Sequence, residues 1–171
     1  DRHLAAMGIG RSDVSTLDRL AFVGRSGMGA LEYHPAKETD FHMESAGLNY
    51  DQIAKECKKI LSSKTSDQLD ILYQLGGSSG GTRPKILLAE NGREWIIKFP
   101  ASRDPTISGK REYDYSLCAK ACGIVMTETD LVRSSVCEGY FKTERFDRKA
   151  GEKVFSITFA GLLEADFRAP S

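Results

Sequence analysis

The 171-residue sequence has no excess of charge of either sign and no long apolar run. Lys and Arg number 24, and Asp and Glu number 24, so the formal net charge is zero. A balanced charge gives no electrostatic reason to expect nucleic acid or an anionic membrane as the main partner. No apolar run approaches the roughly 18–20 residues that cross a membrane, and the charged beginning DRHLAAMG is not a secretory signal. We therefore expect no direct nucleic-acid partner and no membrane partner.

Cysteine is scarce, and its spacing is wrong for a metal site. The four cysteines have neither C-x-x-C spacing nor a neighbouring histidine cluster: Cys57, Cys118, Cys122 and Cys137. Cys118 and Cys122 are four residues apart on an expected helix, but a zinc site would need two more ligands. We expect reduced thiols, no metal bound by the cysteines and a cytoplasmic location.

What is present is the composition of an ordinary folded protein. The sequence is 40% hydrophobic, which allows one core or two small lobes. Residues 17–24 and 29–35 have the pattern of two short strands around a glycine-rich turn. The apolar residues from 50 to 61 have helix spacing. A second short helix is expected next, with Ser66 as its N-cap and Gly76 as the residue after its end.

Strand patterns dominate the rest of the chain. KILLAE and REWIIKF flank Asn91-Gly92, and Asn-Gly between β-rich runs is a strong hairpin signal because both turn positions need positive φ. KREYDYSLCAKACG then predicts a helix that Gly123 ends. TETDLVRSS and EGYFKTERF predict a second antiparallel pair. The segment from residue 151 is expected to begin a new helical region.

Residues 76–85 read GGSSGGTRPK, and two interpretations of this stretch are open. Glycines let backbone N–H groups approach phosphate oxygens with no Cβ in the way, but a run rich in Gly and Ser is also typical of a flexible linker. The phosphate-loop motif GxxxxGK[ST] nearly fits from Gly76 to Gly81, but Thr82 stands where lysine is required. The kinase loop pattern GxGxxGxV also fails. Generic motifs therefore do not decide between a phosphate loop and a linker.

Lys98 is the candidate for contact with phosphate, and Glu112 is the candidate for holding Lys98 in place. Lys98 follows three bulky apolar residues and precedes Phe99-Pro100, an unusual place for a lysine that only solubilises a strand. A lysine on the strand after a glycine loop can reach phosphates as a point charge, and a glutamate on the next helix can hold that lysine in place. Glu112 opens the expected helix, where acidic residues commonly just favour the helix dipole. Its role therefore stays open on pattern alone.

The order of elements from residue 77 to residue 146 has a use in nucleotide binding. A glycine-rich loop leads to a strand, a turn, a strand with a lysine, a helix with a glutamate and two more strands. The segment leaving the last strand offers backbone groups to the edge of an adenine. This is the order of the upper lobe of a protein kinase. We therefore predict an α+β fold, a kinase-like N-lobe with an antiparallel sheet and flanking helices.

Six phrases, in one order, resemble the HipA family of bacterial serine/threonine kinase toxins. They are LDRLAFVGRSGMGALEY, GGSSGGTRPKILL, WIIKFP, REYDYSLCAKACGI, GYFKTERFDR and FAGLLEADFRAPS. The resemblance runs over nearly the whole chain, apart from an unremarkable stretch between residues 35 and 49.

The resemblance implies a set of ATP-binding residues. The family's glycine-rich loop over the ATP phosphates corresponds here to Gly80, Gly81, Thr82, Arg83 and Lys85. Ser78 matches a serine that family members autophosphorylate, which ejects the loop and switches the kinase off. Lys98 matches the strand lysine that faces the phosphates, and Glu112 matches its partner on the helix. The hinge between the lobes, which holds adenine mainly through backbone atoms, corresponds to Glu144, Arg145 and Phe146, and Asp147 is expected to reach the ribose.

The resemblance also implies parts that this sequence does not supply. The family's catalytic aspartate and its Asp and Asn ligands for Mg²⁺ come from a helical lobe after the hinge, and 25 residues follow Phe146 here. We therefore expect a fragment, with the catalytic helical lobe largely absent, that binds ATP weakly and does not transfer phosphate. Its expected parts are the end of the family's N-terminal domain with a connecting helix (1–62), the nucleotide-binding lobe (63–150) and the beginning of the helical lobe (151–171).

Three functions stay open. The first is the nucleotide-binding portion of a HipA-like toxin kinase, whose full-length relatives phosphorylate an aminoacyl-tRNA synthetase and are neutralised by a helix-turn-helix DNA-binding antitoxin. The second is a non-catalytic split subunit or interaction module that docks on a separate kinase or antitoxin chain. The third is a different ATP-dependent phosphotransferase that uses the same upper lobe on a small molecule.

Overall fold

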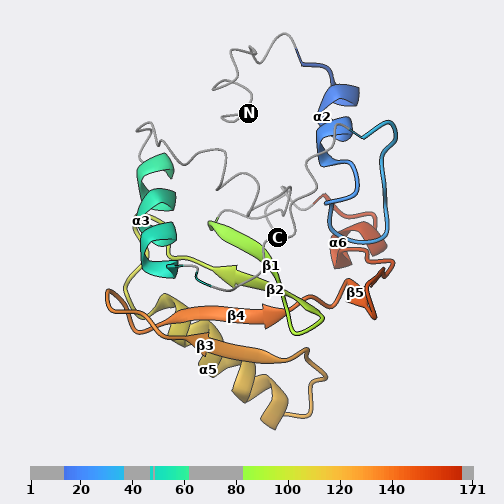
Figure 1. Cartoon of the computed structure of the whole chain (residues 1–171). Helices are drawn as coiled ribbons and strands as arrows, with labels where there is room; N and C mark the ends of the chain where they lie inside the picture. The colour runs from blue at the N-terminus through green and yellow to red at the C-terminus, as the bar shows by residue number, and fades with distance from the viewer. Residues whose placement is uncertain (1–13, 37–46, 48, 62–82, 167–171) are drawn as a thin grey trace.

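A four-stranded antiparallel sheet with strand order β1-β2-β4-β3 forms the centre of the fold (Figure 1). The computed structural model describes residues 14–36, 47, 49–61 and 83–166. The strands of the sheet are β1 Lys85–Glu90, β2 Arg93–Lys98, β3 Thr129–Val132 and β4 Tyr140–Glu144. Helices accompany this sheet, so the predicted α+β class is confirmed, and the arrangement is that of a small kinase-like lobe.

The hairpin between β1 and β2 turns at Asn91-Gly92, as predicted. Asn91 has a φ of 52° and Gly92 a φ of 73°, the positive values that a two-residue hairpin turn requires. The strands pair from Lys85 opposite Lys98 to Glu90 opposite Arg93. Because successive side chains of a strand point to opposite faces, this register puts Lys85 and Lys98 side by side on one face of the sheet.

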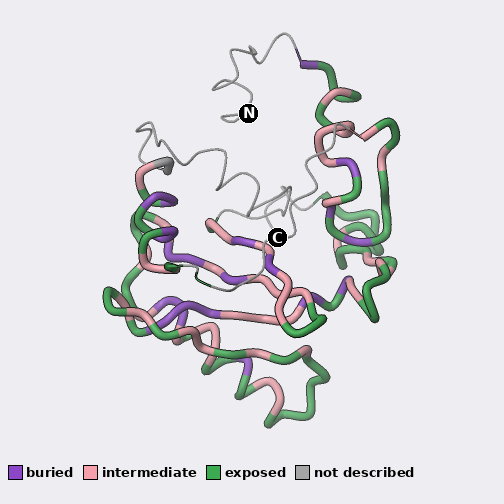
Figure 2. The backbone as a smooth tube through the Cα atoms, viewed as in Figure 1, coloured by how far each residue is buried: buried purple, intermediate pink, exposed green. Residues whose placement is uncertain are grey.

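Helix α3, Tyr50–Leu61, packs against the other face, which we call the α3 face (Figures 1 and 2). The helix was predicted over the same residues, and its apolar positions form one side. The buried core joins this side to the sheet and consists of Ile53, Ala54, Cys57, Ile86, Leu88, Ile97, Phe99 and Tyr140. The rings of Phe99 and Tyr140 meet edge to face with centroids 4.9 Å apart. Burial of these side chains is the main force that holds α3 on the sheet.

Asp51 anchors the beginning of α3 to the segment that joins β3 to β4. Its carboxylate accepts hydrogen bonds from the hydroxyls of Ser134 (2.6 Å), Ser135 (2.6 Å) and Tyr140 (2.8 Å), and from the amide of Ser135 (2.9 Å). The hydrogen bond from Ser134 and those from Ser135 lower the pKa of Asp51 far below its ordinary value. The carboxylate therefore stays charged in the folded protein.

Helix α5, Ser108–Ala121, lies along β3 and β4 on the face with Lys85 and Lys98, which we call the α5 face (Figure 1). The Ser116 hydroxyl lies 2.9 Å from the Thr129 hydroxyl, and the beginning of the helix touches the backbone near Gly139. Gly123, with a φ of 80°, follows the end of the helix as predicted. The predicted second strand pair is also confirmed, with β3 antiparallel to β4.

The N-terminal strand prediction is wrong. Residues predicted as a strand over 17–24 form helix α2, Thr16–Val23, and the described residues between 29 and 35 contain no strand. Ser15 and Asp18 form a capping box, in which each side chain accepts from the other residue's backbone N–H. This local cap decides the helix, and the apolar pattern of LDRLAFV suited either structure. The predicted helix between Ser66 and Gly76 lies outside the described residues.

The C-terminal segment is less helical than expected. Residues after the sheet form a small hairpin of β5, Arg148–Lys149, with β6, Glu152–Lys153, and then the short helix α6, Phe159–Leu162. Thr158 caps α6 by accepting a hydrogen bond from the amide of Gly161. Within the described part of the chain, no helix has the length and apolar character needed to cross a membrane.

Candidate functional site

Lys98 and Glu112 form an ion pair on the α5 face. Lys98 is the last residue of β2, and its Nζ lies 2.7 Å from Oε2 of Glu112. The two side chains are 34% and 25% exposed, so the pair borders solvent without being open to it. The Lys98 Nζ also lies 5.2 Å from the centre of the Phe141 ring. The hairpin register and the packing of α5 therefore bring Lys98 together with the glutamate that the sequence suggested as its partner.

Lys85 stands directly opposite Lys98 across β1 and β2. Like charges at directly opposed positions of a sheet repel one another. Burial lowers the pKa of Lys85, the charge of Lys98 lowers it further, and Glu112 acts in the opposite direction. Two ammonium groups and one carboxylate therefore lie together at this end of the α5 face.

Arg83 joins this group from the end of the glycine-rich stretch. Its Nε and Nη2 donate to the two carboxylate oxygens of Asp104 at 2.8 and 3.2 Å, and its Nη1 donates to Oε1 of Glu112 at 2.9 Å. Asp104 also accepts a hydrogen bond from the amide of Ala101 at 2.9 Å. That bond, and then Arg83, lower the pKa of Asp104. Asp104 carried no prediction in the sequence, although its position soon after the lysine strand could have suggested one.

Most of the predicted glycine-rich loop lies outside the described residues. Ser78, Gly80, Gly81 and Thr82 lie outside the described residues, which resume at Arg83. Their roles in binding ATP and in autophosphorylation stay predictions. The described chain does fix the point from which the loop departs, because Arg83 is bound to the beginning of α5.

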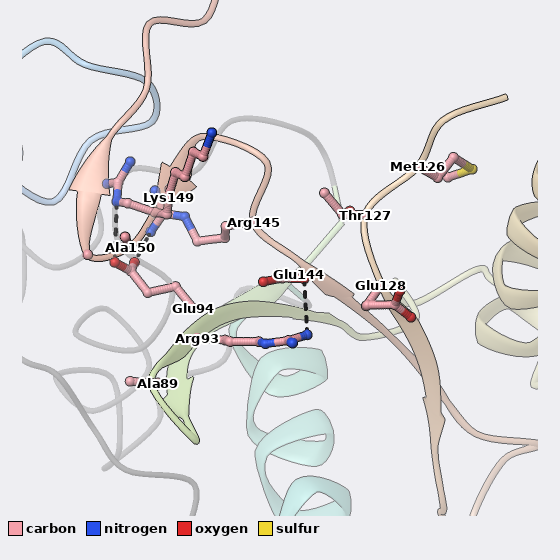
Figure 3. Close-up of a pocket in the computed structure, with 13 residues that line it drawn as sticks. Ala89, Arg93, Glu94, Met126, Thr127, Glu128, Glu144, Arg145, Lys149 and Ala150 are labelled. Atoms are coloured by element: carbon pink, nitrogen blue, oxygen red, sulfur yellow. Dashed lines mark hydrogen bonds and ion pairs between the residues drawn. The ribbon is translucent and has the colours of Figure 1, made fainter.

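A cavity of about 850 Å³ opens at the other end of β2 (Figure 3). It lies among the β1–β2 turn, the segment before β3 and the predicted hinge, and its lining includes Gly92, Glu94, Thr127, Glu144, Arg145 and Lys149. Lys98 and Glu112 do not line it. In the sheet Trp95 pairs with Glu144 and Lys98 pairs with Phe141. The cavity and the lysines therefore occupy opposite ends of the same strands.

The predicted hinge residues differ in whether their backbone amides are hydrogen-bonded within the described chain. The amide of Glu144 donates to the carbonyl of Glu128 and the amide of Arg145 donates to the carbonyl of Glu94, both at 2.8 Å. Phe146 is 64% exposed, and its amide donates to no other described residue. Among the three predicted hinge positions, Phe146 is thus the one whose backbone N–H has no acceptor within the described residues.

Asp147 is buried and has its partners within the protein. Its carboxylate accepts from Nε and Nη2 of Arg145 at 3.0 and 2.8 Å, from Nη1 of Arg148 at 2.9 Å and from the amide of Gly29 at 2.8 Å. Arg148 also donates to the carbonyl of Gly27 at 3.0 Å. This network ties the N-terminal segment to the hinge, and Asp147 is fully buried. The predicted contact of Asp147 with a ribose is therefore not favoured by this geometry.

The described residues offer no metal centre. No group of three or more His, Cys, Asp or Glu side chains comes together within residues 14–36, 47, 49–61 and 83–166. Asp104 and Glu112 are both bound to Arg83, and Glu112 is bound to Lys98 as well, so both carboxylates are already held by cations. The described side chains therefore do not fit a Mg²⁺ site.

Comparison with protein families gave one result. Residues 77–170 match the family described as the HipA-like C-terminal domain, which is more than half of the chain. Comparisons with curated proteins and with solved structures found no match.

Proposed function

The chain belongs to the family of HipA-like C-terminal domains, and we propose that its sheet and α5 form the ATP-binding lobe of a serine/threonine protein kinase. The family match covers the glycine-rich stretch, both lysines, Glu112 and the hinge. The proposal therefore assigns one place to the phosphates and another to the base of the nucleotide.

The observation that carries the proposal is the sequence of cross-strand pairs along the α5 face of β1 and β2. Lys85 opposite Lys98 is followed by Leu87 opposite Ile96 and then by Ala89 opposite Glu94. A cationic end thus leads through an apolar middle to the cavity at the hinge, which both Ala89 and Glu94 line.

This gradient suits a nucleoside triphosphate. An anion beside Lys85 and Lys98 would relieve the repulsion between two half-buried ammonium groups. The apolar pair would contact a ring face, and the amide of Phe146, which has no acceptor within the described residues, would donate to the edge of a base. Lys98 and Trp95 are three residues apart on β2, and Trp95 pairs with the hinge residue Glu144. At 3.3 Å per residue, roughly 10 Å separates the two positions. An extended nucleotide can span that distance.

A purely structural role for Lys98 is the competing explanation. A strand lysine paired with a glutamate can serve only to satisfy two charges, and exposed pairs add little stability. That role does not explain why a second lysine lies directly opposite the first. An anion-binding role explains both lysines.

Mg²⁺ accompanies ATP in kinases, but the described residues do not fit a metal, so we assign no step to it. The described residues bind and orient the nucleotide: Lys85 and Lys98 attract its phosphates, and Glu112 holds Lys98 in the site. ATP when bound would supply the transferable phosphoryl group.

Equilibrium dialysis of the chain with radiolabelled ATP tests the proposal. We expect saturable binding that Lys98→Met weakens by at least about tenfold, since a direct charge–phosphate contact is worth about 1.4 kcal/mol or more. Lys142→Met is the matched control, because Lys142 is also a strand lysine paired with a glutamate, Glu90, but on the α3 face. Equal affinities for both variants and the wild type would remove Lys98 from the site, and no saturable binding would refute the proposal.

The remaining family properties are part of the same proposal. We infer a cytoplasmic toxin kinase of a toxin–antitoxin system, with a helix-turn-helix antitoxin as partner and a protein substrate such as an aminoacyl-tRNA synthetase. Ser78 would be its autophosphorylation site. In the full-length protein, Ser78→Ala should abolish phosphate incorporation into the peptide that contains it and prevent self-inactivation; continued self-inactivation would exclude Ser78.

Exposed apolar side chains near the C-terminus favour a second candidate, an interaction module without its own catalysis. The exposed residues are Phe155, Ile157, Phe159, Leu162 and Leu163. If this candidate is correct, the chain forms a complex with a kinase or antitoxin chain that Phe159→Ser disrupts, whereas ATP binding is absent. Saturable ATP binding that depends on Lys98 would decide for the kinase lobe.

A further inference from the structure

We propose that Arg83 is a positioning residue, which sets the place of Lys98 through Glu112 and Asp104 and does not itself bind phosphate. The inference rests on the proposed ATP-binding function and deepens it. It departs from the role that resemblance gives Arg83, as part of the loop that lines the phosphates.

Every nitrogen of the Arg83 guanidinium already donates to a carboxylate. Nε and Nη2 donate to both oxygens of Asp104, and Nη1 donates to Glu112. The two bonds to Asp104 make the fork-shaped pairing that is the strongest geometry available to arginine. The two N–H groups that these bonds do not use, one on Nη1 and one on Nη2, could meet a phosphate only beside two carboxylates that repel it.

Glu112 is held from two sides. Its Oε1 accepts from Arg83 at 2.9 Å and its Oε2 accepts from Lys98 at 2.7 Å. With each oxygen assigned to one cation, the carboxylate cannot rotate without breaking a bond. The position of the Lys98 ammonium is therefore set by Arg83, although Arg83 and Lys98 share no hydrogen bond.

Asp104 supplies the fixed end of this chain of contacts. It closes the turn after β2 by accepting from the amide of Ala101, and its side chain is 18% exposed. Arg83 thus connects three points: the beginning of β1, the turn after β2 and the beginning of α5.

The two roles of Arg83 predict opposite effects for a change at Asp104. If Arg83 is a positioning residue, Asp104→Asn weakens its anchor, disturbs Glu112 and lowers the affinity for ATP. If Arg83 binds phosphate directly, Asp104→Asn removes a competing carboxylate and leaves ATP affinity unchanged or increases it.

The first measurement is the affinity of Arg83→Gln, Asp104→Asn and the double variant for ATP and for adenosine. We expect each single change to weaken ATP binding by about tenfold and adenosine binding by less than about twofold, with the double variant no worse than either, as for residues that act through one contact. Arg83→Lys keeps the charge but loses the fork, so it should behave like Arg83→Gln. Wild-type ATP affinity in Arg83→Lys, or unchanged or tighter ATP binding in Asp104→Asn, would overturn the inference.

The second measurement needs no ATP and so separates this inference from the proposed function. An amine-reactive ester labels Lys98 at a rate that peptide mass spectrometry reports, with the exposed Lys149 of the same molecule as reference. We expect labelling of Lys98 relative to Lys149 to rise by about threefold or more in Arg83→Gln and in Asp104→Asn, because a loosened Glu112 restrains the ammonium less. Unchanged labelling overturns the inference. If wild-type protein fails to bind ATP while labelling rises, the proposed function fails and the positioning role stands.

Discussion

The backbone of Gly139 lies so close to Gly109 that a Cβ built on Gly109 would come within 2.2 Å of the Gly139 carbonyl oxygen. Gly109 is in the first turn of α5, one turn before Glu112. The close approach therefore sets how near α5 lies to β4, and with it whether Glu112 reaches Lys98. The glycine is required by packing, since its φ is not in the left-handed region.

Gly109→Ala should displace the beginning of α5. Alanine has the higher helix propensity, but the clash is with backbone that cannot rotate away, and overpacking of this kind costs about 1–3 kcal/mol. We expect a lower free energy of unfolding in urea and weaker ATP binding. Gly161→Ala is the control, because a Cβ there first meets flexible side-chain atoms of Ile157 at 3.1 Å. Equal stability of the Gly109→Ala variant and the wild type would show that α5 can shift freely.

Asp147→Asn should destabilise the protein strongly, although the change is nearly isosteric. The side chains of Arg145 and Arg148 are 3% and 8% exposed, and Asp147 is fully buried between them. Removing one partner of a buried ion pair leaves uncompensated charge and costs about 3–5 kcal/mol. Chemical denaturation measures this loss.

Phe146→Ala serves as the control for that change, because Phe146 is adjacent in sequence and 64% exposed. Its stability should be within about 0.5 kcal/mol of the wild type. A stable Asp147→Asn variant with normal denaturation would mean that the network does not hold the hinge, and the ribose contact would then become the better explanation of Asp147.

The sequence predicts some elements correctly and others wrongly. The reason is how far apart in sequence the residues are whose interactions decide each element. The hairpin at Asn91-Gly92 and the end of α5 at Gly123 were predicted because positive φ at those positions is a local requirement. α2 was mistaken for a strand because LDRLAFV is short and apolar, and its helix is decided by the capping box at Ser15. That box is present in the sequence as S-x-x-D, but the strand prediction did not use it.

The candidate site shows the same division. Strand register follows from the turn, so the pairing of Lys85 with Lys98 was within reach of the sequence. Lys98 and Glu112 were correctly placed on neighbouring elements, and their contact depends on the packing at Gly109, which no local pattern reveals. Asp104 and the network around Asp147 join residues far apart in sequence, as in the bond from Gly29 to Asp147. Such contacts can be seen only once the fold is known.

Stability should fall in acid partly because of Asp51. Its hydrogen bonds hold its pKa below the unfolded value near 3.9. Below that value the unfolded state binds a proton that the folded state does not, so the stabilisation is present at neutral pH and is lost as the pH falls through the folded pKa. Urea denaturation between about pH 6 and pH 2 should therefore show a shallower decline for Asp51→Asn than for the wild type.

Tyr140→Phe tests the same site by removing one donor to Asp51. It keeps the bonds from Ser134 and Ser135, which have the larger effects on the pKa. The variant should therefore keep most of the acid sensitivity of the wild type. A decline in Asp51→Asn as steep as that of the wild type would assign the acid sensitivity to other carboxylates.

Cys57 should be inert in the folded protein and reactive in urea. It is 8% exposed in the core under α3, and burial, followed by the charge of Glu56, raises its thiol pKa to about 12. Only the thiolate reacts, so at pH 8 the reactive fraction is about 10⁻⁴ in the folded state, against roughly a quarter for an unfolded thiol with a pKa near 8.5.

Brief alkylation with iodoacetamide, followed by peptide mass spectrometry, measures this difference. The native protein should be modified at the exposed Cys118 and Cys122, and Cys57 should be modified at a comparable rate only after urea is added. Because Cys57 lies in the core that joins α3 to the sheet, its protection reports the docking of that helix. Rapid native alkylation of Cys57 would mean that α3 leaves the sheet often, and the α3 face would then be open to solvent for part of the time.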